Sequence, residues 1–191
     1  GNLFSVDNAI KAIVRNRFIS QDPDKLMHAD YIIFPGVGSF SDCIKSMKNL
    51  GLDIFLKEYA ATGKPILSIC LGMQMLMTEG SEGGSSKGIG LIEGCVHKLV
   101  YSKNSRIPHM GWNNIYGSDM KDIKILNGIE SQSSFYFVHS YHVVPTENLK
   151  KIYTDFYGID IVAGFQKDNL FAIQFHPEKS QRLGIHLLKN F

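Results

Sequence analysis

A cysteine, Cys70, stands directly between the apolar run 65–69 and the pair Leu71-Gly72. This pattern is typical of a strand, a tight turn and the start of a helix, an arrangement that exposes a nucleophile at the turn. The N-terminus of the following helix favours the thiolate, which is the nucleophilic form of a cysteine. The pattern therefore predicts a thiol-dependent hydrolytic or transfer enzyme with Cys70 as its nucleophile.

A thiol nucleophile needs a base, and the segment His176-Pro177-Glu178 near the C-terminus offers one. Side chains two positions apart on a strand share one face, so the carboxylate of Glu178 can orient the imidazole of His176. His176 would then take the proton of the thiol while Glu178 supports the imidazolium. We expect the three side chains to form a Cys–His–Glu triad.

A glycine loop, Pro35-Gly36-Val37-Gly38, follows another apolar run. Glycines after a parallel strand let backbone amides converge on an anion, although the dinucleotide pattern GxGxxG is absent. In acyl chemistry such a loop supplies one oxyanion donor, and the amide of Leu71 supplies the second. A structural turn without chemistry is the alternative interpretation.

Size and composition predict one globular domain over residues 1–191, because 44% of the 191 residues are hydrophobic and 20% are charged. The net charge of +2 and scattered basic residues give no reason to expect nucleic acid. Three unpaired cysteines, the lack of a signal peptide and the lack of an apolar span of about 20 residues predict a cytoplasmic protein. No metal-ligand motif is present, so we expect neither a metal site nor a cofactor.

The elements that must position these residues alternate in the first half of the chain. Helical spacing and Ser5 predict a helix over 5–13, and a helix capped by Ser39 is predicted through Tyr59. The predicted strands are 29–34 and 65–69, and a helix over 71–77 follows Cys70. Strand, helix, strand, helix implies a parallel sheet in an α/β fold.

The second half changes character after a Gly/Ser loop at 80–88. Short aromatic-rich runs then predict antiparallel strands, and a helix over 180–191 closes the chain. The predicted strands are 91–101, 135–144, 151–157, 161–166 and 170–175. An α/β sheet normally opens with a strand, whereas this chain opens with a loop and a helix, so we expect the first strand to be missing.

Three motifs, in this order and spacing, resemble the triad-type (class I) glutamine amidotransferases. They are Pro-Gly-Val-Gly-Ser-Phe at 35–40, Cys-Leu-Gly-Met-Gln at 70–74 and Phe-His-Pro-Glu-Lys-Ser at 175–180. More narrowly, the segments at 1–6, 108–113 and 137–141 resemble the glutaminase subunits of imidazole glycerol phosphate synthases. The resemblance runs from end to end and implies a flavodoxin-like three-layer fold with a mostly parallel central sheet and antiparallel C-terminal strands. Family members carry a strand just before the Gly-Asn-Leu segment.

The resemblance implies that Cys70 attacks the side-chain amide of glutamine and forms a γ-glutamyl thioester, while His176 shuttles protons. The amides of Val37 and Leu71 would face the oxyanion, and Gly36 and Gly38 would let a peptide turn toward it. The implied substrate-binding residues are Gln74, Glu82, His139, Ser140 and Tyr141. Asn2 would border the glutamine pocket.

The family also implies a partner, a (β/α)8 cyclase subunit that receives the ammonia and makes imidazole glycerol phosphate in histidine biosynthesis. The expected assembly is a heterodimer whose glutaminase is activated when the cyclase is liganded. The implied interface residues are Met110, Gly111, Trp112, Asn113 and Lys179.

Other functions remain open at this point. A paralogous glutaminase could supply ammonia to a sugar amidotransferase in surface-polysaccharide biosynthesis, since such subfamilies differ in surface loops like 78–90. A non-catalytic scaffold that activates its partner would be expected to lack a triad residue, whereas all three are present. A chaperone or peptidase with the same cysteine turn would not explain the His-Pro-Glu segment.

Overall fold

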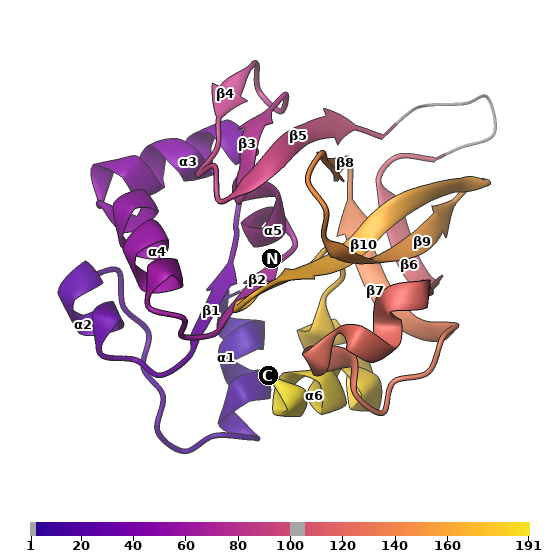
Figure 1. Cartoon of the computed structure of the whole chain (residues 1–191), viewed down its shortest axis with the longest axis horizontal. Coiled ribbons are helices and arrows are strands. Elements are labelled where there is room, and N and C mark those ends of the chain that lie inside the picture. Colours follow the sequence, from indigo (N-terminus) through magenta and orange to yellow (C-terminus); the bar gives the residue numbers. More distant parts are fainter. Residues whose placement is uncertain (1–2, 100–105) are drawn as a thin grey trace.

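The structure, a computed structural model, describes residues 3–99 and 106–191. Its central element in that part of the chain is a five-stranded mixed sheet in the order β1-β2-β11-β10-β9 (Figure 1). The strands are β1 (Ile32–Pro35), β2 (Ile66–Ile69), β9 (Lys150–Phe156), β10 (Ile159–Lys167) and β11 (Leu170–Ile173). The turn of the candidate nucleophile follows β2, and the candidate base follows β11.

Helices cover both faces of this sheet (Figure 1). The helices are α1 (Leu3–Lys11), α2 (Pro23–Met27), α3 (Phe40–Asn49), α4 (Leu52–Ala61), α5 (Leu71–Met75) and α6 (Gln181–Asn190), with short 3-10 helices η1 (Ser118–Asp122), η2 (Lys124–Leu126) and η3 (Pro177–Lys179). Helices α3, α4 and α5 share one hydrophobic cluster, and α1 and α6 share the other. The protein therefore has the three-layer α/β arrangement that the sequence predicted.

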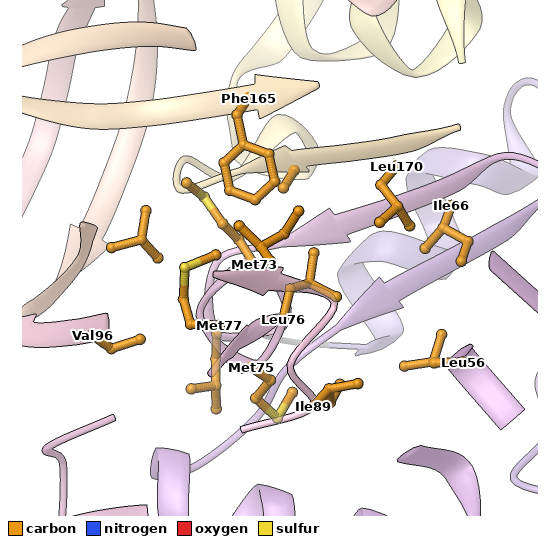
Figure 2. Packing of buried hydrophobic residues seen from close by; sticks show 14 of the residues in the cluster. Leu56, Ile66, Met73, Met75, Leu76, Met77, Ile89, Val96, Phe165 and Leu170 are labelled. Atoms are coloured by element: carbon orange, nitrogen blue, oxygen red, sulfur yellow. The ribbon is translucent and has the colours of Figure 1, made fainter. Parts of the chain in front are cut away.

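Strand residues alternate between the two clusters. Ile66 and Leu170 face the α3–α4 side, whereas their neighbours Leu67 and Phe171 face the α1–α6 side. Figure 2 shows Ile66 and Leu170 beside one another in the first cluster, together with Met73 of α5. Because both faces of the strands are buried, their sequences are continuous apolar runs.

Two smaller sheets flank the central sheet. One has the order β4-β3-β5-β8, and the other pairs β6 with β7. Their strands are β3 (Met77–Gly80), β4 (Ser86–Lys87), β5 (Ile92–Lys98), β6 (His109–Ile115), β7 (Ser133–His139) and β8 (Tyr141–Pro145). The antiparallel pair β6–β7 brings His109 opposite His139.

Several predicted helix bounds are wrong. The helix predicted through Tyr59 is two helices, because Gly51 adopts the left-handed conformation (φ 69°) between α3 and α4. Its predicted cap is confirmed, since the Ser39 side chain accepts a hydrogen bond from the amide of Asp42. Helix α1 begins at Leu3, so Ser5 lies inside the helix and does not cap it. The helix after Cys70 ends at Met75.

The predicted sheet is also corrected. Within the central sheet, parallel pairing joins β1, β2 and β11, whereas β10 is antiparallel to β11 and to β9, so this sheet is mixed and not mostly parallel. The prediction that β11 is antiparallel fails at β2, where Leu170 aligns with Ile66 in a parallel register. The run 135–144 forms two strands, β7 and β8, and the predicted Gly/Ser loop contains β4.

Other outcomes concern the strands around these sheets. Strand β6 lies in a segment for which no strand was predicted. Residues 100 and 101 of the strand predicted at 91–101 lie outside the described residues. The absence of a first strand stays a prediction. Within the described ranges, no helix is long and apolar enough to cross a membrane.

Candidate active site

Cys70 occupies a strained turn between β2 and α5. Its backbone has φ 55° and ψ −111°, a conformation that costs a non-glycine residue about 1–3 kcal/mol and that is concentrated at functional sites. The turn is held at both ends, because the Cys70 amide donates to the Ile173 carbonyl at 2.8 Å and the Cys70 carbonyl accepts from the Gln74 amide at 3.2 Å. The side chain is nearly buried, with 7% of the residue exposed.

Glycines let the neighbouring loop approach this turn. A Cβ added to Gly72 would lie 2.1 Å from the Phe34 carbonyl oxygen at the end of β1. A Cβ added to Gly36 would lie 2.6 Å from the Cβ of Leu71. Both contacts are too short for any side chain, so glycine at these positions is what brings the loop after β1 against the start of α5.

His176 and Glu178 form a buried pair after β11. The Nδ1 atom of His176 lies 2.8 Å from Oε1 of Glu178, and their side chains are 1% and 0% exposed. The turn is fixed to β7, since the His176 amide donates to the Tyr136 carbonyl at 2.9 Å. The Ser180 hydroxyl donates to the His176 carbonyl at 2.6 Å and accepts from the Tyr136 amide at 3.0 Å. The sequence reasoning missed Ser180, although it completes the Phe-His-Pro-Glu-Lys-Ser motif.

The other two members of the predicted triad raise the pKa of the His176 imidazole. Burial opposes its charged form, but Cys70 and Glu178 favour that form more strongly and raise the pKa of His176 to about 9. The thiol and the ring are therefore neighbours. Their contact falls short of hydrogen-bond geometry, because Nε2 of His176 has no hydrogen-bond partner among the described residues. That nitrogen is the atom that a substrate or the thiol would engage.

The predicted oxyanion residues lie next to the turn. Val37 is exposed (57%), and Gly38 after it has φ 97°. Burial raises the pKa of the Cys43 thiol, and the backbone of Val37 opposes this shift. Leu71 immediately follows Cys70 in the chain. The oxyanion roles of Val37 and Leu71 stay predictions.

Gln74 reaches across the site from α5. Its Nε2 donates to the Tyr141 carbonyl at 3.0 Å and to Oε1 of Gln174 at 3.0 Å. Nε2 of Gln174 in turn donates to the sulfur of Cys70 at 3.5 Å. Because both N–H groups of Gln74 are used inside the protein, only its Oε1 is left to accept from a substrate.

Gln174 was missed by the sequence reasoning. The signal was there: a glutamine inside the apolar run 170–175 is a polar group in a buried strand, and such groups need partners. Its side chain is fully buried.

Glu82 links the glycine-rich turn to α3. Its Oε2 accepts from the Phe40 amide at 2.8 Å, so the carboxylate satisfies a donor in the first turn of that helix. The second carboxylate oxygen remains for the ammonium group of a substrate. The substrate-binding role of Glu82 stays a prediction.

The segment 139–141 places one side chain inward. Nδ1 of His139 donates to the Tyr141 carbonyl at 2.8 Å, and its Nε2 accepts from Nδ1 of His109 at 3.0 Å. Burial, opposed by the Tyr141 hydrogen bond, lowers the pKa of His139 to about 3, so the ring is neutral. His139 therefore orients the segment, and Ser140 and Tyr141 are left as the members that could meet a glutamine.

The predicted interface residues on β6 differ in exposure. Met110 and Trp112 are exposed (66% and 50%), with Gly111 between them at φ 128°. The Asn113 side chain instead donates to the Asp155 carbonyl at 2.6 Å and lies 3.1 Å from Nε2 of His109.

The exposed Lys179 of η3 lies beside two aromatic side chains. The Lys179 ammonium lies 5.5 Å from the Tyr136 ring, and that ring lies 6.1 Å from Trp112. Trp112, Tyr136 and Lys179 thus form one continuous surface beside η3, which joins the active-site turn to the exterior. An interface role for these residues stays a prediction.

Two further findings bear on cofactors and ligands. Among the described residues, no group of three or more His, Cys, Asp or Glu side chains is placed to hold a metal ion. A cavity of about 530 Å³ lies away from Cys70, between α3 and β4, where Lys45, Lys48 and Lys87 contribute to its lining. Asn2, which was expected to border the glutamine pocket, lies outside the described residues.

The chain was compared with known families and curated proteins. The family model "Glutamine amidotransferase class-I" matches residues 6–191. Subunit HisH 1 of imidazole glycerol phosphate synthase from Campylobacter jejuni is 46% identical over 192 residues, which span 100% of this chain and 94% of that protein. The HisH subunit from Acinetobacter baylyi is 41% identical over 191 residues, or 100% of this chain and 92% of that protein.

Solved structures show the same fold. A crystal structure of a glutamine amidotransferase superposes with a TM-score of 0.72 at 16% identity and covers 100% of this chain and 94% of that chain. The structure of PurLQS from Thermotoga maritima gives a TM-score of 0.68 at 17% identity, with 98% and 90% covered.

Proposed function

The chain belongs to the class-I glutamine amidotransferase family and, within it, to the HisH subunits of imidazole glycerol phosphate synthase, and we propose that it releases ammonia from glutamine with a Cys70–His176–Glu178 triad. The ammonia serves the synthase reaction in histidine biosynthesis. The observation that carries the triad is the buried His176–Glu178 pair, 2.8 Å apart, with a His176 pKa raised to about 9 by Cys70 and Glu178 against the effect of burial.

In the first half of the reaction, the Cys70 sulfur attacks the side-chain carbonyl carbon of glutamine. The carbonyl π bond opens to an oxyanion, which the backbone amides near Val37 and Leu71 stabilise. His176, protonated at neutral pH, gives its proton to the amide nitrogen. The carbon–nitrogen bond then breaks, ammonia leaves, and a γ-glutamyl thioester remains on Cys70.

In the second half, water replaces the sulfur. His176 is now neutral and accepts a proton from the attacking water, while Glu178 supports the imidazolium that forms. The carbon–sulfur bond breaks, and the thiolate of Cys70 is restored as glutamate departs. No metal ion or cofactor takes part in this scheme.

We propose that the partner is a (β/α)8 cyclase subunit in a heterodimer. Ammonia in bulk water at neutral pH is protonated and ceases to be a nucleophile, so an enclosed passage to the second active site is an advantage. The exposed side chains of Met110 and Trp112 and the Lys179–Tyr136 contact support this face as the docking surface. Docking there would act on η3, which carries Glu178.

The test is glutamate release from glutamine by the wild-type chain, measured with and without the cyclase subunit and an analogue of its substrate. We expect release to increase when the liganded cyclase is present and to vanish in Cys70→Ala. Release by Cys70→Ala at the wild-type rate would overturn the triad. Stimulation by a sugar amidotransferase in place of the cyclase would identify the surface-polysaccharide paralogue, and an inactive wild-type complex would identify a scaffold.

A further inference from the structure

A chain of buried hydrogen bonds ends at the sulfur of Cys70. It begins at the Tyr141 carbonyl, which accepts from Nε2 of Gln74, and continues through the contact between Gln74 and Gln174 to the sulfur. Gln74 is 4% exposed and Gln174 is 0% exposed. The two buried amides are hydrogen-bonded to each other at 3.0 Å.

The chemistry of the partners fixes the orientation of both amides. An amide oxygen and nitrogen have nearly the same shape, so their assignment follows from the groups that they meet. The Tyr141 carbonyl only accepts, so the Gln74 atom 3.0 Å from it is the NH₂ group. That group only donates, so the Gln174 atom 3.0 Å from it is the oxygen. The Gln174 atom that faces the sulfur at 3.5 Å is therefore its NH₂ group.

The Tyr141 carbonyl, where this series of hydrogen bonds begins, already accepts two hydrogen bonds. The Tyr141 carbonyl also accepts from Nδ1 of His139 at 2.8 Å, so both of its lone pairs have donors. Nε2 of His139 is held in turn by His109 on β6. The carbonyl cannot turn toward another donor without leaving a buried group unpaired, which makes it a fixed reference for Gln74.

The sulfur has a different partner for each protonation state. The Val138 carbonyl oxygen lies 4.0 Å from the sulfur and can accept the hydrogen of a thiol. As a thiolate, the sulfur only accepts, and the Gln174 NH₂ group is placed to donate to it. Its titratable neighbour is His176, whose pKa Cys70 and Glu178 raise against the effect of burial. A donated hydrogen bond to a buried anion is stronger than one between neutral groups.

We propose that Gln174 stabilises and positions the Cys70 thiolate through its side-chain NH₂ group, and that Gln74 acts as a positioning residue that keeps this group turned toward the sulfur. The inference rests on the proposed function in one respect, the identity of Cys70 as the nucleophile. It assigns Gln74 a task inside the protein in addition to its predicted contact with glutamine.

The test is the pH dependence of Cys70 alkylation by iodoacetamide, quantified on the Cys70 peptide by mass spectrometry so that Cys43 and Cys95 do not contribute. Gln174→Met removes the donor and keeps an unbranched side chain of similar length. We expect the midpoint of its alkylation profile to move upward by about one to two pH units, the usual size for a lost hydrogen bond to a charged group. Gln174→Glu, which places an oxygen against the sulfur, should move it further.

The matched control is Gln166→Met. Gln166 is a buried glutamine on the neighbouring strand β10, where its amide accepts from Lys124 and donates to the Asp168 carbonyl. This variant should lose stability and keep the wild-type alkylation midpoint. Equal midpoints for the wild type and both Gln174 variants, or a shift of the same size in Gln166→Met, would overturn the proposal.

A second measurement needs no core substitution at Gln174. In the wild-type chain, the side-chain NH₂ resonances of Gln174 should shift in NMR spectra over the pH range in which Cys70 becomes reactive, and this shift should be absent in Cys70→Ala. Unchanged resonances in the wild type would contradict the proposal even if the Gln174 variants fail to fold. If instead the midpoints shift as expected but Cys70→Ala still releases glutamate, the proposed function fails and the assignment of Gln174 stands.

Discussion

At the scale of single residues, the site combines one strained backbone with several buried polar groups. Cys70 holds φ 55°, and His176 and Glu178 are both buried without contact to water. Burying a carboxylate is costly unless it is paired. Oε1 of Glu178 is paired with His176, while its Oε2 has no hydrogen-bond partner among the described residues. The charge of Glu178 is therefore directed toward His176.

Removal of this charge is the first prediction. In Glu178→Gln the amide keeps the shape of the carboxylate but loses the charge that helps to raise the pKa of His176 to about 9. We expect the pKa of His176 to fall and the kcat of glutamine hydrolysis, measured with the cyclase present, to fall by about 10³–10⁴-fold, as in related triads. An NMR titration of the His176 ring gives the pKa.

The control is Glu147→Gln. Glu147 is also in an ion pair, 2.6 Å from the Lys167 ammonium, but neither residue belongs to the predicted triad. It should leave kcat unchanged. A wild-type kcat in Glu178→Gln would show that the carboxylate has no part in the reaction.

At the scale of elements, the site depends on close packing of short segments. Helix α6 lies against η3 at Gly184, where an added Cβ would lie 1.8 Å from the Pro177 carbonyl oxygen. No shift of a flexible side chain can relieve this contact, because both partners are backbone. The position of Glu178 is thus tied to the packing of α6 against η3.

We therefore predict that Gly184→Ala pushes α6 away from the turn of the triad. The free energy of unfolding, measured by urea denaturation, should fall by about 1–3 kcal/mol, as expected for an overpacked site. Glutaminase activity should fall with it. The exposed Lys189→Ala in the same helix should change stability by less than about 0.5 kcal/mol. A Gly184→Ala protein as stable and active as the wild type would contradict this packing account.

Helices, strands and turns could be predicted from the sequence where neighbouring residues determine them. The strand–turn–helix at Cys70 and the Ser39 cap follow from neighbouring residues. The break at Gly51 could have been read from its glycine, but helical spacing continues across it. The parallel pairing of β11 with β2 depends on residues about one hundred positions apart, which no local pattern encodes.

The same limit applies to the site. Cys70, His176 and Glu178 were selected by type and spacing, and their neighbourhood is reflected in the raised pKa of His176. Gln174 and Cys70 follow two strands, β11 and β2, that are adjacent only in the folded sheet, so the sequence could at most mark Gln174 as a polar residue in an apolar run. The inward direction of Asn113 likewise follows from β6 pairing with β7.

At the scale of the whole molecule, the fold raises the pKa of one buried histidine, His176, and lowers that of another, His139. The fold buries both His176 and His139, and their charges interact. One is held charged by its partners, and the other is kept neutral by burial. Their effects on stability have opposite signs with respect to pH.

We predict that stability is greatest near pH 6.5. The pKa of His176 is raised to about 9, so its contribution is complete below about 6.5 and is lost as the pH rises toward 9. The pKa of His139 is lowered to about 3. Between about pH 6.5 and pH 3 the imidazole therefore binds a proton only in the unfolded chain, so stability falls as the pH falls. His109 and His142 act in the same direction as His139.

Urea denaturation between pH 5 and 9 measures this profile and stays clear of most carboxylate titration. Each group changes the free energy of unfolding by at most about 1.4 kcal/mol per pH unit. In His176→Gln the decline on the alkaline side should flatten. A stability that rises steadily from pH 6.5 to 9 would contradict the charge assigned to His176.

The central claim is that Cys70 carries the glutamyl group during turnover. The most direct measurement is to quench the complex with acid while it hydrolyses glutamine and to search its peptides by mass spectrometry for a γ-glutamyl thioester. We predict the adduct on the peptide of Cys70 and its absence from Cys70→Ala. Turnover without an adduct on Cys70, or an adduct on Cys43 or Cys95 in its place, would contradict the account.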